Sequence, residues 1–175
     1  MRGDLLDDVR AVLRTTPGRW EILVRGLPAD LLERLPAPGE WSALDCLVRL
    51  VDAEKVVFPV RVRCFLSGEP LPDLSPERQG FGRRGRATDL AVEFTRQRQE
   101  SLVLLETLSA EDLERTAGHD RFGQVTLRQM LNEWAAHDLL RTVQAERALM
   151  QHFLPGTGPW RDAFKDHDLG AATTR

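Results

Sequence analysis

Apolar side chains recur every three or four residues in four long stretches of this 175-residue chain. This spacing places them on one face of an α-helix, whereas a half-buried strand requires strict alternation. The stretches run from about 5 to 27, 44 to 66, 88 to 108 and 126 to 152. Since no stretch shows the alternation of a strand, the pattern predicts an all-α fold in which four helices form a bundle.

The starts and interruptions of these helices also have sequence signals. Ser42 followed by Asp45 predicts the start of the second helix, and Thr126 predicts the start of the fourth. Pro17 interrupts the first pattern, so we expect that helix to bend or restart there. Pro59 lies inside the second helix and should kink it.

The second predicted helix is apolar on nearly every side. A helix with one side in water keeps a polar face. We therefore expect neighbouring helices or a second subunit to cover it. Its apolar residues are Leu44, Leu47, Val48, Leu50, Val51, Val57, Phe58, Val60, Val62 and Phe65.

Length and composition restrict the class of protein. A chain of this length supports one domain with a hydrophobic core and is short for two. We expect the bundle to span residues 1–154 and a tail rich in Pro and Gly to span 155–175. A hydrophobic content of 42% with 29% charged residues is typical of a folded soluble protein.

The charge pattern argues against two kinds of partner. A net charge of -3 and an isoelectric point near 5.8 do not suit a nucleic-acid binder, which needs a cationic surface. Charges interrupt the longest apolar runs, so no membrane span is predicted. The acidic start lacks the features of a signal peptide. We expect a cytoplasmic protein without nucleic-acid or membrane partners.

Two short stretches, 41–54 and 126–141, have the most specific patterns. Their distinctive residues are Trp41, Ser42, Asp52, Glu54, Trp134, His137 and Asp138. In this order and at these distances, they resemble the two halves of the metal site in the DinB-like (DinB/YfiT-like) family. That resemblance implies an antiparallel four-helix bundle with up-down-down-up connection, often as a homodimer.

The same resemblance implies a metal site. Family members with the full site bind zinc or nickel through three histidines from two helices, and they include thiol-dependent transferases and isomerases. Histidines four residues apart lie on one helix face, and a third from a neighbouring helix completes the set. The remaining coordination positions stay open for water or a thiolate.

Two of the three ligand positions are arginine in this chain. Arg49 stands where the family pattern reads His-Leu-x-x-x-Glu, and Arg141 stands four residues after His137. A guanidinium has no free lone pair and places a positive charge where the cation would lie. We therefore expect no metal cofactor. His137 is the single remaining ligand candidate, and zinc or nickel would require substituted ligands.

The two arginines allow two interpretations. Together with His137, Arg49 and Arg141 would suit a carboxylate or phosphate. Alternatively, each arginine pairs within its own helix, because Asp45 lies four residues before Arg49 and Asp138 lies three before Arg141. We favour the internal pairing.

Cys46 and Trp134 complete the predicted pocket. Cys46 lies three residues before Arg49 and is expected to be a small buried thiol, although a rearranged site with His137 is an alternative. Cys46 and Cys64 lie 18 residues apart in one predicted helix, so we expect both to be reduced. Trp134 is expected to pack as part of the pocket frame.

Three functions follow from this sequence, and whether the chain is an enzyme stays open. The first is the binding of a small anionic or thiol molecule in the former metal pocket. The second is a non-enzymatic role as a dimeric helical bundle. The third is a divergent metal-dependent transferase or hydrolase with substituted ligands. Arginines around a cavity would favour the first function, and Asp45 and Asp138 closing on them would favour the second.

Overall fold

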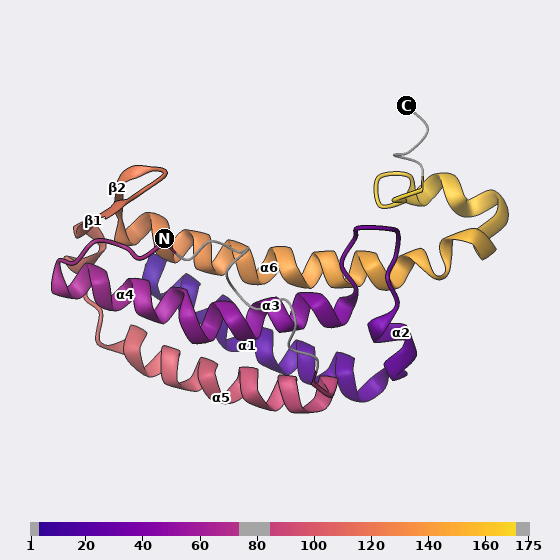
Figure 1. Cartoon of the computed structure of the whole chain (residues 1–175), viewed down its shortest axis with the longest axis horizontal. Helices are drawn as coiled ribbons and strands as arrows, with labels where there is room; N and C mark the ends of the chain where they lie inside the picture. The colour runs from indigo at the N-terminus through magenta and orange to yellow at the C-terminus, as the bar shows by residue number, and fades with distance from the viewer. Residues whose placement is uncertain (1–3, 74–84, 171–175) are drawn as a thin grey trace.

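A computed structural model describes residues 4–73 and 85–170 of the chain. These residues form four long helical segments, with a small β-hairpin before the last of them (Figure 1). The helices are α1 (Leu5–Gly26), α2 (Ala29–Glu33), α3 (Ala43–Val56), α4 (Phe58–Ser67), α5 (Ala87–Glu106) and α6 (Leu127–Gln151). The 3-10 helices are η2 (Asp112–Glu114) and η3 (Leu154–Phe164), and the strands are β1 (Thr116–His119) and β2 (Gly123–Thr126).

The long helices form the predicted bundle. Helices α1 and α6 run in one direction, and α3 with α4 and α5 run in the other, which is the expected up-down-down-up connection (Figure 1). Both α1 and α3 pack against α5 and α6. The order around the bundle is therefore α1, α5, α3, α6, and residues from all four can meet at its axis.

Capping boxes begin two of the helices, as predicted. The Ser42 side chain accepts a hydrogen bond from the backbone of Asp45, whose carboxylate accepts one from the backbone of Ser42. Thr126 and Gln129 form the same reciprocal pair at the start of α6. Each box satisfies backbone donors that have no partner inside the helix.

The two predicted interruptions have different outcomes. The chain breaks at Val57, and Pro59 lies in the first turn of α4, so the kink predicted at Pro59 is confirmed as a break between two helices. Near Pro17 we expected a bend or a restart; the restart is wrong, because α1 is continuous from Leu5 to Gly26, and the bend stays a prediction. Pro17 still removes one helical donor, since a proline has no N–H for the carbonyl four residues earlier. That carbonyl belongs to Leu13.

The β-hairpin was not predicted from the sequence. Its strands pair antiparallel, from Thr116 with Thr126 to His119 with Gly123. Gly123 has a φ of 70°, a conformation that glycine adopts without strain. Four-residue strands are too short to show a clear alternation, which is why the sequence pattern missed them. A hydrogen bond from the Leu71 N–H to the Gly118 carbonyl, 2.9 Å, ties the hairpin to the end of α4.

Neighbouring helices of the same chain cover most of the apolar second helix. Leu47, Leu50 and Val51 of α3 are buried between α5 and α6. Cys46 and Cys64 are buried and free, as predicted. We expected either neighbouring helices or a second subunit to cover this helix. Packing within the chain therefore explains the burial of its apolar residues without a second subunit.

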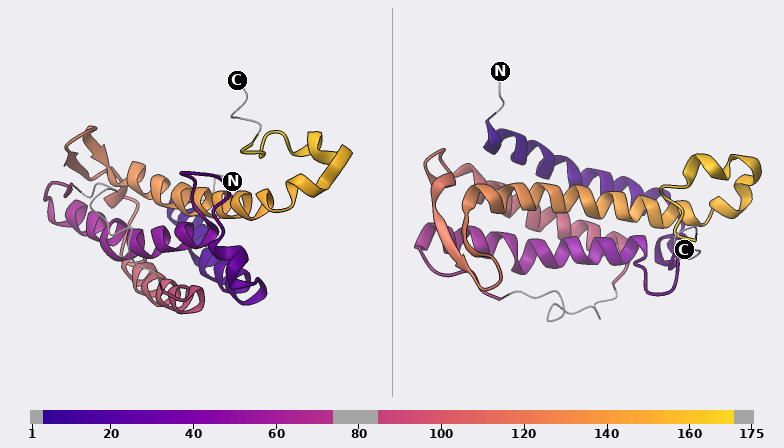
Figure 2. Two further views of the ribbon diagram at one scale, coloured as in Figure 1. Left: turned by 45° about the vertical axis from the view of Figure 1, so that its right-hand side comes forward. Right: turned by 90° about the horizontal axis from the view of Figure 1, so that it is seen from above.

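Residues after α6 fold back against its end (Figure 2). The Gln151 side chain donates to the His167 carbonyl at 2.9 Å and accepts from the Leu169 N–H at 2.9 Å. The predicted boundary between bundle and tail at 154 and 155 stays a prediction. Within 4–73 and 85–170, no helix is both long and apolar enough to cross a bilayer.

Candidate functional site

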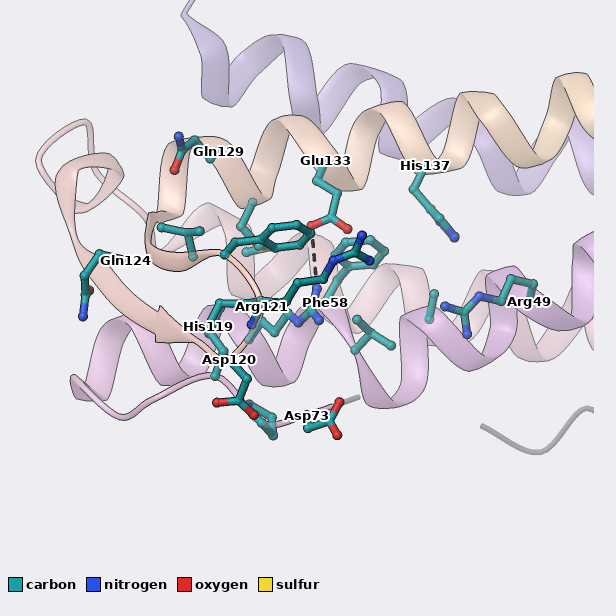
Figure 3. Close-up of a pocket in the computed structure, with 18 residues that line it drawn as sticks. Arg49, Phe58, Asp73, His119, Asp120, Arg121, Gln124, Gln129, Glu133 and His137 are labelled. Atoms are coloured by element: carbon teal, nitrogen blue, oxygen red, sulfur yellow. Dashed lines mark hydrogen bonds and ion pairs between the residues drawn. The ribbon is translucent and has the colours of Figure 1, made fainter. Parts of the chain in front are cut away.

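A pocket of about 710 Å³ opens between α3, α4, α6 and the hairpin (Figure 3). This volume lies within the range of small-molecule sites. Arg49 from α3 and His137 from α6 lie at one end, and His119 and Gln124 of the hairpin lie at the other. Its other lining residues are Ala53, Val57, Phe58, Arg61, Leu71, Pro72, Asp73, Asp120, Arg121, Phe122, Val125, Gln129, Met130 and Glu133.

A buried charge cluster lies at the centre of the bundle. Arg98 on α5 donates to both carboxylate oxygens of Glu54, at 2.9 and 2.8 Å, and to both of Asp138, at 2.7 and 3.1 Å. Its fifth N–H donates to the Leu13 carbonyl at 2.8 Å. All five guanidinium donors are therefore used, and each of the three charged side chains is only 1% exposed.

Burial shifts the protonation equilibria of this cluster. Burial raises the pKa of Asp138, although the charge and hydrogen bonds of Arg98 act in the opposite direction. Burial also tends to lower the pKa of Arg98, but Asp138 and Glu54 together raise it above its usual value. The guanidinium thus stays charged, and the cluster fixes four helices through one side chain.

The predicted pairing of Arg141 with Asp138 is wrong. Asp138 points to the bundle axis and is engaged by Arg98. Arg141 instead donates from Nε to the His137 Nε2 at 3.2 Å and from Nη1 to the Gln144 side chain at 2.7 Å. Its guanidinium also lies 4.7 Å from the centre of the Trp41 ring, which allows a cation–π interaction.

The predicted pairing of Arg49 with Asp45 is wrong as well. The Asp45 carboxylate accepts from the backbone N–H and the hydroxyl of Ser42, at 2.9 and 2.7 Å, and so belongs to the helix cap. Arg49 lines the pocket. Burial and the charge of Arg141 lower the pKa of Arg49, and Asp52 partly offsets this.

His137 is a neutral donor in this environment. Burial and the charges of Arg141, Arg49 and Arg98 lower the pKa of His137 from 6.5 to about 3. Its Nε2 accepts from Arg141, so the hydrogen bond assigns the proton to Nδ1. The Nδ1 atom is buried and has no acceptor among the described residues. His137, whose side chain lines the pocket, therefore carries a buried N–H donor that has no acceptor among the described residues.

The residues at the three expected ligand positions do not fit a divalent cation. Arg49 and Arg141 have no lone pair to offer, and the Nε2 lone pair of His137 accepts from Arg141. No group of three or more His, Cys, Asp or Glu side chains in the described ranges is placed to hold a metal. The donors that converge here instead suit an anion.

Cys46 and Trp134 lie behind the pocket and do not line it. Cys46 is fully buried, and burial raises the pKa of its thiol to about 12, so the thiolate is not populated at neutral pH. Trp134 is fully buried and stacks on Phe58 with ring centres 5.0 Å apart. Among the six residues predicted for the site, the pocket therefore includes Arg49 and His137, with Arg141 in contact with His137.

Sequence reasoning missed Arg61. It lies on α4, lines the pocket and is only 12% exposed. The break at Val57 brings Arg61 to the same pocket as Arg49, and a spacing of twelve residues across a broken helix gives no visible sequence signal. Arg121 and His119 were missed because the hairpin was not predicted.

Comparison with known proteins places the chain in a family. A family model described as the DinB superfamily matches residues 13–156. The structure of YfiT from Bacillus subtilis, reported as a probable metal-dependent hydrolase with an unusual four-helix bundle topology, is similar with a TM-score of 0.74. The sequences are 14% identical, and the alignment covers 84% of this chain and 87% of YfiT. A search of curated protein sequences finds no match.

Proposed function

The chain belongs to the DinB superfamily, and we propose that it binds a small anionic molecule, without a metal, in the pocket lined by Arg49 and His137. Three features support this proposal: the change of ligands to arginine, the state of His137 and the composition of the pocket wall. The ligand is expected to present hydrogen-bond acceptors to the Arg49 and His137 end of the pocket.

The observation that carries the proposal is the hydrogen bond from Arg141 to His137. It occupies the lone pair with which Nε2 would bind a metal, and it leaves Nδ1–H as the group that needs a partner. A buried donor without an acceptor costs free energy, so a bound acceptor would stabilise the site. Arg49 adds a positive charge at the same end of the pocket.

The pocket wall supports a small molecule with an apolar part. Val57, Phe58 and Met130 supply apolar surface, while Arg49 and Arg61 supply positive charge. Pockets that bind small molecules combine such a wall with a few placed polar groups. A bare inorganic ion would leave the apolar surface without a contact.

Anion binding is tested by calorimetric titration of the protein with phosphate, acetate and phenylacetate. We expect phenylacetate to bind most tightly, because it offers both a carboxylate and an apolar body. Arg49→Gln should weaken its binding by about tenfold, while the exposed Arg63→Gln should leave it unchanged. Absence of binding by all three anions would refute the proposal.

Self-association is the second candidate function. Leu140 and Val143 of α6 are exposed and border a shallow hollow that includes Trp41. Exposed apolar side chains beside such a hollow suit contact with a second copy of the bundle. Light scattering over a range of concentrations tests this, and Leu140→Glu should shift a dimer to monomer. A wild-type mass that stays monomeric would exclude it.

A metal-dependent transferase or hydrolase with substituted ligands is the third candidate. It requires a cation in a site where two arginines already provide positive charge. Elemental analysis of untagged protein after exposure to zinc and nickel tests it directly. Near-stoichiometric metal that is lost in His137→Ala would support this function and contradict the metal-free pocket.

A further inference from the structure

We infer that the ligand has two acceptor groups, one bound by Arg49 and His137 and the other by Arg61, and that Glu133 takes the place of the second group when the pocket is empty. This rests on the proposed function and specifies the chemical class of the ligand. The structure supports it through the surroundings of Arg61, the position of Glu133 and the spacing of both along the helices.

Arg61 is a largely buried cation with an incomplete set of partners. Its side chain is 12% exposed, and its Nε is buried without an acceptor among the described residues. The nearest carboxylate contact is from Nη1 to Glu133 at 3.6 Å, which is longer than a hydrogen bond. A buried guanidinium is costly unless its donors are used, so Arg61 needs a better acceptor than Glu133 provides.

Glu133 is placed as a competitor that a ligand can displace. Its side chain is 58% exposed, so it can turn into solvent without losing a buried contact. Both Glu133 and Arg61 line the pocket, and their contact joins α6 to α4. A ligand carboxylate at Arg61 would therefore replace a weak exposed ion pair with direct hydrogen bonds.

The two acceptor positions lie about one helical turn apart. Glu133 precedes His137 by four residues on α6, which corresponds to a rise of roughly 6 Å. Arg61 faces the first of these positions, and Arg49 lies with the second. Both guanidinium groups belong to side chains that line the same pocket, and the charge of Arg61 contributes to lowering the pKa of Arg49.

The wall between these positions is apolar. Ala53, Val57 and Phe58 line the pocket near the junction of α3 and α4, which separates Arg49 from Arg61 in the chain. A dicarboxylate with a methylene chain matches this arrangement, because each carboxylate would meet one arginine and the methylene chain would contact the apolar wall between them. A single phosphate or a monocarboxylate would fill only one of the two positions.

Calorimetric titration with malonate, succinate, glutarate and adipate, each against the monocarboxylate of the same carbon number, tests the inference. We expect affinity to peak at glutarate or adipate and to exceed the matched monocarboxylate by about tenfold, which corresponds to one further charge-assisted contact. Arg61→Gln should remove this preference, and Arg63→Gln, on the exposed side of α4, should retain it.

Glu133→Gln provides a second test on a half-exposed side chain, where the fold is not at risk. It removes the competing charge, so dicarboxylate affinity should rise several-fold. The matched control is Glu146→Gln, because Glu146 is also on α6, is similarly exposed and makes a loose 3.8 Å ion pair with Arg19 away from the pocket. This control should leave affinity unchanged.

The outcomes separate the inference from the proposal beneath it. Equal affinity for dicarboxylates and monocarboxylates, or a chain-length preference that survives in Arg61→Gln, would overturn the two-group ligand while leaving anion binding intact. Unchanged affinity in Glu133→Gln would overturn the role of Glu133 as a competitor. Absence of binding by every carboxylate would overturn both the inference and the proposed function.

Discussion

Arg98 donates a hydrogen bond to the backbone carbonyl of Leu13 at 2.8 Å, and that carbonyl has no helical donor because residue 17 is a proline. A local interruption in α1 thus supplies an acceptor for a charge on α5. The Thr16 hydroxyl, next to the proline, donates to the Val12 carbonyl at 3.1 Å and tends to lower the pKa of Asp138. Pro17 therefore helps to build the buried cluster at the bundle axis.

Loss of Arg98 should destabilise the bundle strongly. Arg98→Met leaves Glu54 and Asp138 buried without a counter-charge, and breaking such a cluster costs about 3–5 kcal/mol. The free energy of unfolding from urea titration at pH 7 measures this. Arg96→Met is the matched control on the same helix, because the Arg96 pair with Glu100 is exposed and should contribute less than about 1 kcal/mol. Similar effects of the two variants would contradict the central role of Arg98.

Stability should fall as the pH drops below 6.5 because of His137. The pKa of this imidazole is about 3 in the folded protein and near 6.5 when unfolded. Between these values the unfolded chain binds a proton that the folded chain does not, so the free energy of unfolding decreases by up to about 1.4 kcal/mol per pH unit. Urea titrations at pH 7, 6 and 5 measure the slope. The slope should flatten in His137→Gln but persist in the exposed His167→Gln. A slope in His137→Gln equal to that of the wild type would exclude His137 as the cause.

Histidines at the two arginine positions should create a metal site. The double variant Arg49→His with Arg141→His would place three imidazoles at the expected ligand positions, and it would also release the Nε2 of His137. We expect close to one equivalent of zinc or nickel by elemental analysis, against less than about a tenth for the wild type. Adding His137→Ala should abolish the gain. A double variant that stays metal-free would show that the geometry of the site has changed along with its residues.

The thiol of Cys46 should be unreactive in the folded protein. It is fully buried, and its pKa of about 12 leaves almost no thiolate at pH 8. Titration with a thiol-specific chromogenic disulfide should therefore detect Cys46 only after denaturant is added, with Cys46→Ser identifying its share of the signal. Rapid modification of Cys46 under native conditions would contradict the buried position.

Local sequence signals were sufficient for much of the fold. Ser42 and Thr126 mark helix starts because a capping side chain acts on backbone groups two or three residues away. Pro59 marks a break because its ring acts on the preceding turn. Residues 41–54 and 126–141 likewise indicated the family, and the matching family model confirms it.

Partners of charged side chains were not predictable in the same way. Asp138 lies three residues from Arg141 in sequence, yet it pairs with Arg98, forty residues away, because it faces the bundle axis. Asp45 lies one turn from Arg49, yet its carboxylate completes the cap. Spacing along a helix gives the neighbours that a side chain can reach, and the direction of packing decides which one it contacts.

The sequence by itself determined the four helices, their starts and the replacement of two metal-ligand positions by Arg49 and Arg141, because each depends on residues close together in the chain. The tertiary structure alone decided that Arg98 joins Glu54 and Asp138, that Arg141 engages His137, and that Arg61 and the hairpin complete the pocket. These contacts join segments that only helix packing brings together. A buried charge takes the partner that packing places within hydrogen-bond distance, whatever its separation in the sequence.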